Sequence, residues 1–169
     1  AGGADWYRSL SRTPEEAGTI LVGLSGHLER TECFELPMGI PLREVVEQCG
    51  GGVRGGRRFK ACLPGGASTP YLNAAQLDTP LDHLHMEQAG SRLGTAGVTV
   101  FDETTCMVAA TLNLARFFAR ESCGWCTPCR DGLPVVVWLL EEFEAGRGSH
   151  ELLAMLRDQV RNIGGRSFC

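Results

Sequence analysis

The 169-residue sequence has no apolar run near the roughly 20 residues that a bilayer-spanning helix needs, so it predicts no transmembrane segment. It has no signal-peptide pattern at its start. It also has no excess of positive charge, because 16 basic and 20 acidic residues leave a net charge of −4. That balance argues against a nucleic-acid binder. Aromatic residues are scarce at 7%, but the 43% of hydrophobic residues is enough to fill a core.

Recognisable catalytic and phosphate-binding patterns are also missing. Carboxylates pair only as neighbours, at Asp102-Glu103 and Glu141-Glu142, where strand or helix geometry points adjacent side chains apart. His83 and His85 lie in an irregular polar stretch and are expected at the surface. The glycine-rich residues 50–56 lack Rossmann or P-loop order and predict a flexible connection. The basic residues between 54 and 60 have no interleaved stacking aromatics, which favours a solvated strand end or a subunit contact over nucleic acid.

The first part of the sequence predicts a small α+β sheet with one helix across it. Residues 19–24 are rich in β-branched side chains and predict a strand, with residues 29–34 as its hairpin partner. Residues 41–49 carry apolar side chains at helical spacing, and Pro41 suits the first helical position. Residues 57–63 alternate and predict a half-exposed strand, with Cys62 on the same face as Arg58 and Lys60. Residues 98–101 predict the last strand.

After about Thr104 the hydrophobic period changes to 3.6 residues. Apolar side chains then predict three helices, over residues 107–118, 133–143 and 152–163. Residues 146–148 separate the second helix from the third, and Ser149 is a candidate cap for the third. Each helix needs neighbours to bury its apolar stripe, so this part predicts a helical bundle.

The eight cysteines fall into two groups. Four are scattered singly among apolar neighbours and are expected to act as small buried hydrophobes: Cys33, Cys49, Cys62 and Cys106. The others comprise a tight run and one distant residue: Cys123, Cys126, Cys129 and Cys169. A chain able to build a core has no need of a disulfide scaffold. The sequence therefore predicts a reduced, intracellular protein with one metal-type cluster.

The run C-x2-C-x2-C is typical of a [4Fe-4S] site, because three thiolates on a looping segment can cap three irons and a remote fourth can close the cage. Zinc sites more often use two facing pairs of cysteines, and a redox dithiol needs only two. Gly124 lets the loop curl, Pro128 marks the start of a following helix whose N-terminus favours negative charge, and Arg130 adds a positive charge. Trp125 is expected to pack over the cluster and exclude water. With four thiolates no iron is left open, which favours electron transfer over catalysis at the cluster.

Residues 121–132 read ESCGWCTPCRDG, with Cys169 standing 40 positions beyond Cys129. This pattern resembles the signature of the flavin-bearing, NADH-oxidising iron–sulfur subunit of bacterial respiratory NADH–quinone oxidoreductase, or complex I. Further segments resemble the same family: residues 59–61, 64–67, 89–95, 117–120 and 164–169. The resemblance spans essentially the whole sequence.

The resemblance implies a lead-in at residues 1–18, a soluble ligand-binding β-grasp domain at 19–103 and a helical iron–sulfur domain at 104–169. It implies that Cys123, Cys126, Cys129 and Cys169 ligate one [4Fe-4S] cluster, which takes electrons from FMN reduced by NADH. The implied partners are other iron–sulfur subunits of the peripheral arm. The implied location is cytoplasmic, on the inner face of the bacterial inner membrane, without direct membrane insertion.

The family's FMN and NADH sites belong to a larger N-terminal domain whose glycine-rich loops have no counterpart here. The chain also starts without Met and stops at Cys169, so we expect a C-terminal piece of the parent subunit that does not oxidise NADH by itself. Flavin subunits of NAD-dependent hydrogenases and formate dehydrogenases share the motif and are one alternative. A zinc-stabilised interaction module without redox activity is an alternative of another class.

Overall fold

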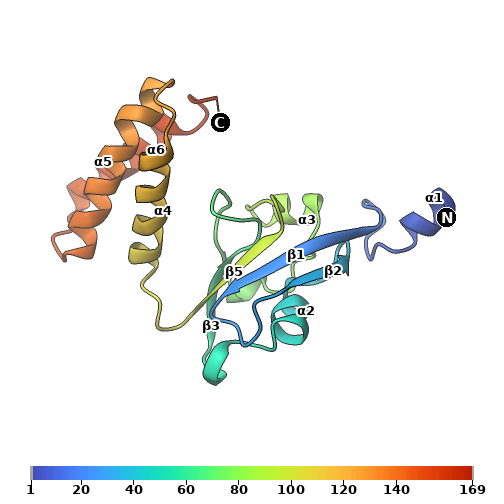
Figure 1. Cartoon of the computed structure of the whole chain (residues 1–169). Coiled ribbons are helices and arrows are strands. Elements are labelled where there is room, and N and C mark those ends of the chain that lie inside the picture. The colour runs from blue at the N-terminus through green and yellow to red at the C-terminus, as the bar shows by residue number, and fades with distance from the viewer. Residues whose placement is uncertain (1, 169) are drawn as a thin grey trace. The chain divides into compact units, whose positions relative to one another are not determined.

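The computed structural model describes residues 2–168. Two compact units make up the chain, Ala1–Thr104 and Thr105–Cys169 (Figure 1). The division falls where the hydrophobic period of the sequence changes. Each unit has its own hydrophobic cluster, and the two are described separately.

The first unit is built on a mixed five-stranded sheet with the order β2-β1-β5-β3-β4. Its strands are β1 (Thr19–Gly26), β2 (Cys33–Pro37), β3 (Phe59–Leu63), β4 (Leu72–Asn73) and β5 (Gly97–Asp102). β1 and β5 are parallel neighbours, whereas the other pairs are antiparallel. The predicted α+β class is confirmed, and the sheet order agrees with a β-grasp domain.

The predicted helix after Pro41 forms as one helical stretch, α2 (Leu42–Glu44) followed by a π-helical turn, η1 (Val45–Cys49). Pro41 has extended backbone and stands just before the first helical residue. The helix buries Leu42, Val45 and Val46 in the core cluster that also contains Val22 of β1 and Val98 of β5. The i, i+3, i+4 spacing thus marks the face that covers the sheet.

The hairpin partner of β1 lies later in the sequence than predicted. β2 pairs Cys33 with Gly23 and Pro37 with Thr19, so residues 29–32 belong to the connection. Leu28 is fully buried and forms an isolated bridge with Val53. The backbone N–H groups of Glu29 and Arg30 donate to carbonyls of the glycine-rich segment. These contacts fix residues 27–32 as a loop, and they also anchor residues 50–53, which the sequence predicted to be a flexible connection.

β3 does not keep the predicted alternation. The register with β5 shifts between Phe59 and Ala61, which inserts Lys60 as an extra residue. Beyond this bulge the faces exchange, so Cys62 points into the core beside Val100 and is fully buried. The prediction that Cys62 shares the exposed face with Lys60 is therefore wrong.

Two of the four scattered cysteines are exposed, which corrects the expectation that all are buried. In β2, Phe34 and Leu36 pack on the core, so Cys33 takes the opposite face. Cys106 precedes the first residue of a helix, where its thiol lies 3.4 Å from Glu144 Oε2. Cys49 is half-buried and Cys62 is buried.

The predicted loop between β3 and β5 contains short ordered elements, namely β4, η3 (Ala74–Gln76) and α3 (His83–Gln88). The fully buried Asp82 caps α3 by accepting a hydrogen bond from His85 N at 2.7 Å, and it also contacts His85 Nδ1 at 2.7 Å. His83 is exposed and contacts Glu16, as a surface residue would. The histidines therefore lie on a capped helix rather than in an irregular stretch.

Near the end of β5, Arg57 pairs with the buried Asp102 at 3.0 Å and Arg58 pairs with Glu103 at 2.6 Å. Thr104 donates to Asp102 Oδ1, and this bond, with Arg57, holds the pKa of Asp102 well below its usual range. The basic residues thus neutralise acids at a solvated strand end. Asp102 and Glu103 have different partners, as expected for neighbouring side chains that point apart.

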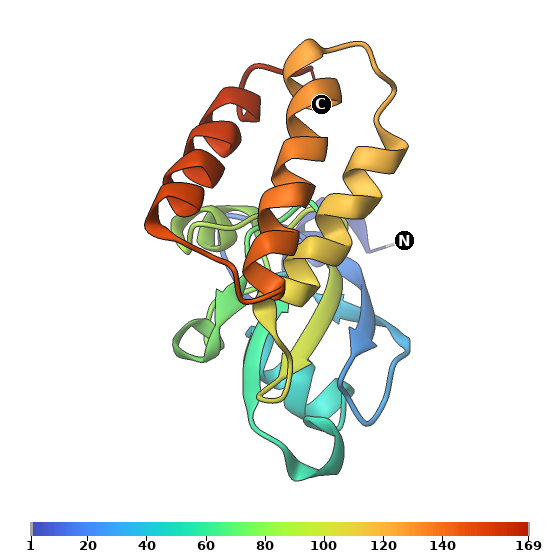
Figure 2. The same cartoon turned by 90° about the vertical axis from the view of Figure 1, so that its left-hand side faces the viewer.

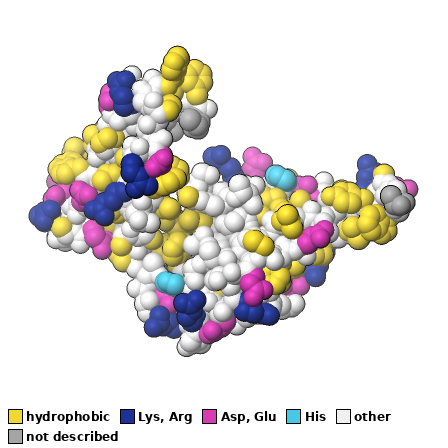
Figure 3. Space-filling view, in the orientation of Figure 1, with side chains coloured by type: hydrophobic (Ala, Val, Ile, Leu, Met, Phe, Trp, Pro, Cys, Tyr) yellow, Lys and Arg dark blue, Asp and Glu magenta, His cyan; other side chains and the backbone are white. Residues whose placement is uncertain are grey.

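Two further short elements occur in this unit, α1 (Gly3–Arg8) and η2 (Arg54–Gly56). Hydrophobic side chains gather on the surface over α1 (Figure 3). Trp6 and Tyr7 are 54% and 46% exposed there.

The second unit contains the three predicted helices, α4 (Met107–Glu121), α5 (Thr127–Glu144) and α6 (His150–Ile163). α5 lies between the other two (Figure 2). Ser149 caps α6 by accepting from Leu152 N at 3.2 Å, which confirms that prediction. The core is small, with buried Leu112 and Ala115 from α4 and Val136 and Leu140 from α5. Leu139 is also buried, although it is not one of the apolar residues at helical spacing from which the sequence predicts this helix.

Several glycines of the first unit allow close backbone approaches, and Gly65 is one of them. A Cβ at Gly65 would lie 2.3 Å from the Leu93 carbonyl oxygen, which is too short for a side chain. We expect Gly65→Ala to destabilise the unit by about 1–3 kcal/mol, because backbone must move. Hydrogen exchange of the β5 amides measures this loss. Gly23→Ala is the control, since its nearest neighbour would be Cys33 Sγ at 3.7 Å; equal protection of both variants would contradict the prediction.

Candidate metal centre

The cysteine run lies where α4 ends and α5 begins. Ser122 follows the last residue of α4, and Cys123 is exposed in the connecting loop. Cys126 is the N-cap residue of α5, and Cys129 is in the first turn of that helix. Both of these are half-buried. The expectation that Pro128 marks the helix start is confirmed, because it lies in the first turn of α5.

The loop is folded by a small set of hydrogen bonds. Gly124 adopts a left-handed backbone conformation, with φ at +77°, that a residue with a Cβ rarely takes. Its N–H donates to Ser122 Oγ at 3.3 Å, and its carbonyl accepts from Arg130 Nη1 at 3.3 Å. Ser122 Oγ lies 3.4 Å from Cys129 Sγ. These contacts connect the end of α4 to the first turn of α5.

Charges near the loop are paired within the same segment. Arg130 contacts Asp131 at 2.9 Å, and this hydrogen bond lowers the pKa of the Asp131 carboxyl. Arg120 contacts Glu121 at 2.9 Å. The positive charge that the sequence places at Arg130 is therefore balanced by an exposed carboxylate beside it. The first turn of α5 contains no acidic residue, so the N-terminal N–H groups of the helix are the local source of positive potential.

Trp125 is 78% exposed in the loop. Its expected packing over a cluster stays a prediction.

Within residues 2–168, no three His, Cys, Asp or Glu side chains converge closely enough to hold a metal ion. The loop thus brings three cysteines into one short segment without closing a site. The fourth predicted ligand, Cys169, lies outside the described residues. The complete ligand set remains a prediction.

α6 packs against α5 one turn after Cys129. Gly132 is buried in α5, and a Cβ there would lie 2.9 Å from Ile163 at the end of α6. Thr127 and Asp131 of α5 line a groove together with Asn162 and Arg166. The segment that leads to Cys169 therefore leaves α6 beside the cysteine run. Gly132 was not predicted to be a packing position, because the helix predicted over residues 133–143 begins after it. The structure places it inside α5, where a glycine is a signal of close packing.

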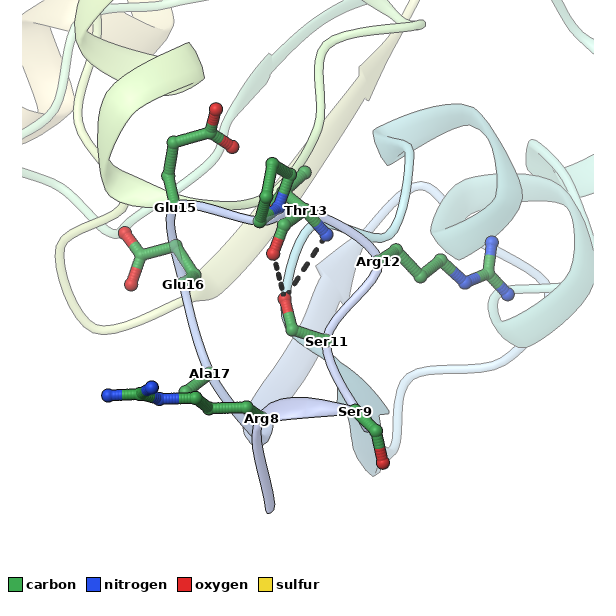
Figure 4. Close-up of a pocket in the computed structure, with 9 residues that line it drawn as sticks. Arg8, Ser9, Ser11, Arg12, Thr13, Glu15, Glu16 and Ala17 are labelled. Carbon is green, nitrogen blue, oxygen red and sulfur yellow. Dashed lines mark hydrogen bonds between the residues drawn. The ribbon is translucent and has the colours of Figure 1, made fainter. Parts of the chain in front are cut away.

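A second hollow occurs in the first unit, among residues 8–17 (Figure 4). Two of its charged side chains already have partners, because Arg12 pairs with Glu44 and Glu16 contacts His83. Ser11 Oγ donates to the carbonyl of Thr13 within the same turn. The hollow contains no cysteine and offers no metal-binding set.

Comparisons with known proteins bear on both units. The family described as "NADH-ubiquinone oxidoreductase-F iron-sulfur binding region" matches residues 109–169, and the SLBB domain family matches residues 21–72. The F subunit of the NADH-quinone oxidoreductase of Escherichia coli is 46% identical over 170 residues, covering 100% of this chain and 38% of the relative. The corresponding protein of Mycobacterium tuberculosis H37Rv is 47% identical over 168 residues, covering 99% of this chain and 37% of the relative.

Along its whole length the chain matches the family of NADH-quinone oxidoreductase F subunits. It corresponds to the C-terminal SLBB and iron–sulfur-binding region of that family, and spans less than two fifths of the length of these relatives. In a solved structure, an NAD+-reducing [NiFe]-hydrogenase has a chain that is similar with a TM-score of 0.83 and 32% identity. That likeness covers 99% of this chain and 28% of the hydrogenase chain. No helix within residues 2–168 is long and apolar enough to cross a membrane.

This region of the F subunit should show a graded thiol reactivity when it is free of metal. We expect Cys123, Cys33 and Cys106 to be alkylated by iodoacetamide at pH 8 far faster than Cys62. Cys62 is fully buried, and burial raises its pKa to about 12, so almost no reactive thiolate forms. Peptide mass spectrometry measures the rates, with the guanidinium-unfolded chain as the control. Equal rates for Cys62 and Cys123 in the folded protein would contradict this burial.

Proposed function

We propose that this region of the F subunit holds one [4Fe-4S] cluster on the thiolates of Cys123, Cys126, Cys129 and Cys169, and that the cluster serves electron transfer. The observation that carries the proposal is the placement of three cysteines around the N-terminus of α5, beside the end of α6. Thiolates are the ligands that iron–sulfur clusters use, and the match to an iron–sulfur binding family agrees with this donor set.

The length of the chain after α6 allows the fourth thiolate to reach the other three. Cys169 follows Ile163 by six residues, which span at most roughly 20 Å when extended. Because Ile163 packs on Gly132, one turn after Cys129, this length is enough to return to the loop. The uncapped first turn of α5 also favours negatively charged ligands, since its N–H groups carry partial positive charge.

The chain's own residues would hold and shield the cluster, which when bound supplies one-electron transfer. The Gly124 turn and the α5 N-terminus orient the thiolates. We place the FMN and NADH sites in the part of the parent subunit that this chain does not span, so the region alone is not expected to oxidise NADH. In the parent, electrons from FMN reduced by NADH would pass through this site to iron–sulfur subunits of the peripheral arm, on the cytoplasmic face of the inner membrane.

A second candidate is the corresponding flavin subunit of an NAD-dependent hydrogenase. The structural likeness to the NAD+-reducing [NiFe]-hydrogenase favours it. The identity of 46–47% to the quinone-linked relatives, against 32% to the hydrogenase chain, favours the first assignment. Both candidate functions give the cysteines the same role, as ligands of an iron–sulfur cluster.

Anaerobic reconstitution with iron and sulfide tests the cluster. We expect a brown protein with about four irons and four sulfides per chain, and an electron paramagnetic resonance signal after dithionite reduction. Cys126→Ser should abolish the four-thiolate cluster. Cys33→Ser is the matched control, since Cys33 is exposed in the sheet unit and should leave the cluster intact. A colourless protein that holds one zinc ion, or an unchanged cluster in Cys126→Ser, would overturn the proposal.

A further inference from the structure

The hydroxyl of Ser122 lies within hydrogen-bond distance of the sulfur of Cys129. Ser122 lies at the end of α4, outside the cysteine spacing that defines the motif, and Cys129 lies in the first turn of α5. Their Oγ and Sγ atoms are 3.4 Å apart, a hydrogen-bond distance for the larger sulfur atom. Both side chains are partly shielded from water.

The direction of this hydrogen bond follows from the other partner of Ser122. A serine hydroxyl has one proton to donate and two lone pairs to accept with. The N–H of Gly124 donates to Ser122 Oγ at 3.3 Å, which uses a lone pair and leaves the proton available. A thiolate bound to iron has no proton of its own, so Cys129 Sγ can only accept.

We propose that the Ser122 hydroxyl donates a hydrogen bond to Cys129 Sγ and thereby raises the reduction potential of the cluster that Cys129 ligates. This inference rests on the proposed function. Reduction adds one electron and no proton, so the thiolates of the reduced site carry more negative charge. A hydrogen bond to a charged acceptor strengthens with that charge, and it therefore stabilises the reduced form more than the oxidised form. Ser122 is thus a positioning and tuning residue rather than a ligand.

The test is an anaerobic redox titration of the reconstituted protein, monitored by electron paramagnetic resonance. In Ser122→Ala, we expect the ratio of reduced to oxidised cluster at a fixed potential to fall about tenfold, equal to about 59 mV for one electron. Ser122→Thr retains the hydroxyl and should restore the wild-type potential. The four irons per chain should remain in both variants.

Two controls separate tuning from a merely structural role. Ser149→Ala removes the hydroxyl that caps α6, so it should lower the melting temperature and leave the reduction potential unchanged. Electron–nuclear double resonance of the reduced wild-type protein should show a coupled proton that exchanges in D2O and is missing from Ser122→Ala. If the Ala variant does not assemble a cluster, the wild-type spectrum tests the hydrogen bond by itself. The lack of an exchangeable coupled proton in that spectrum would overturn the inference.

The outcomes distinguish the two proposals. If the wild-type protein assembles no iron–sulfur cluster, the proposed function itself is wrong. A wild-type cluster whose potential is the same in Ser122→Ala, or is shifted as much by Ser122→Thr as by Ser122→Ala, removes only the role of Ser122.

Discussion

The site depends on how α6 packs against α5. In the proposed site, three thiolates would come from the α4–α5 loop and the first turn of α5, and the fourth would come from Cys169, 40 positions after Cys129. Gly132 has no side chain, so Ile163 can lie directly on the turn that follows Cys129. α6 has no fully buried residue, so the burial of apolar side chains contributes little to its packing on the bundle. A cluster ligated beyond α6 would therefore add to the folding free energy of the unit, as bound metals commonly do.

The helical unit could be predicted closely because its signals are local. A period of 3.6 residues and a Ser149 cap identify helices without knowledge of their neighbours, and α4, α5 and α6 follow that pattern. The sheet unit was harder. Lys60 is an extra residue in a bulge, and Leu28 leaves the strand pattern to fill the core. Both depend on tertiary packing, which alternation along the sequence does not reveal.

The cysteine spacing carries the chemistry of the site, whereas its surroundings come from the fold. Spacing predicts which residues supply thiolates, and residues 109–169 match a family described as an iron–sulfur binding region. Spacing does not show that Ser122 touches Cys129, or that Arg130 pairs with Asp131. The first contact follows from the short loop between α4 and α5, which brings the two side chains together across a helix junction, whereas Arg130 and Asp131 are neighbours in α5.

The most direct test of the four-cysteine site is a crystal structure of the anaerobically reconstituted protein, with anomalous diffraction measured at the iron edge. We expect four iron peaks in one cube, with sulfur ligands from Cys123, Cys126, Cys129 and Cys169. An ordered C-terminus whose Cys169 sulfur binds no iron, or a single metal peak at the loop, would contradict it.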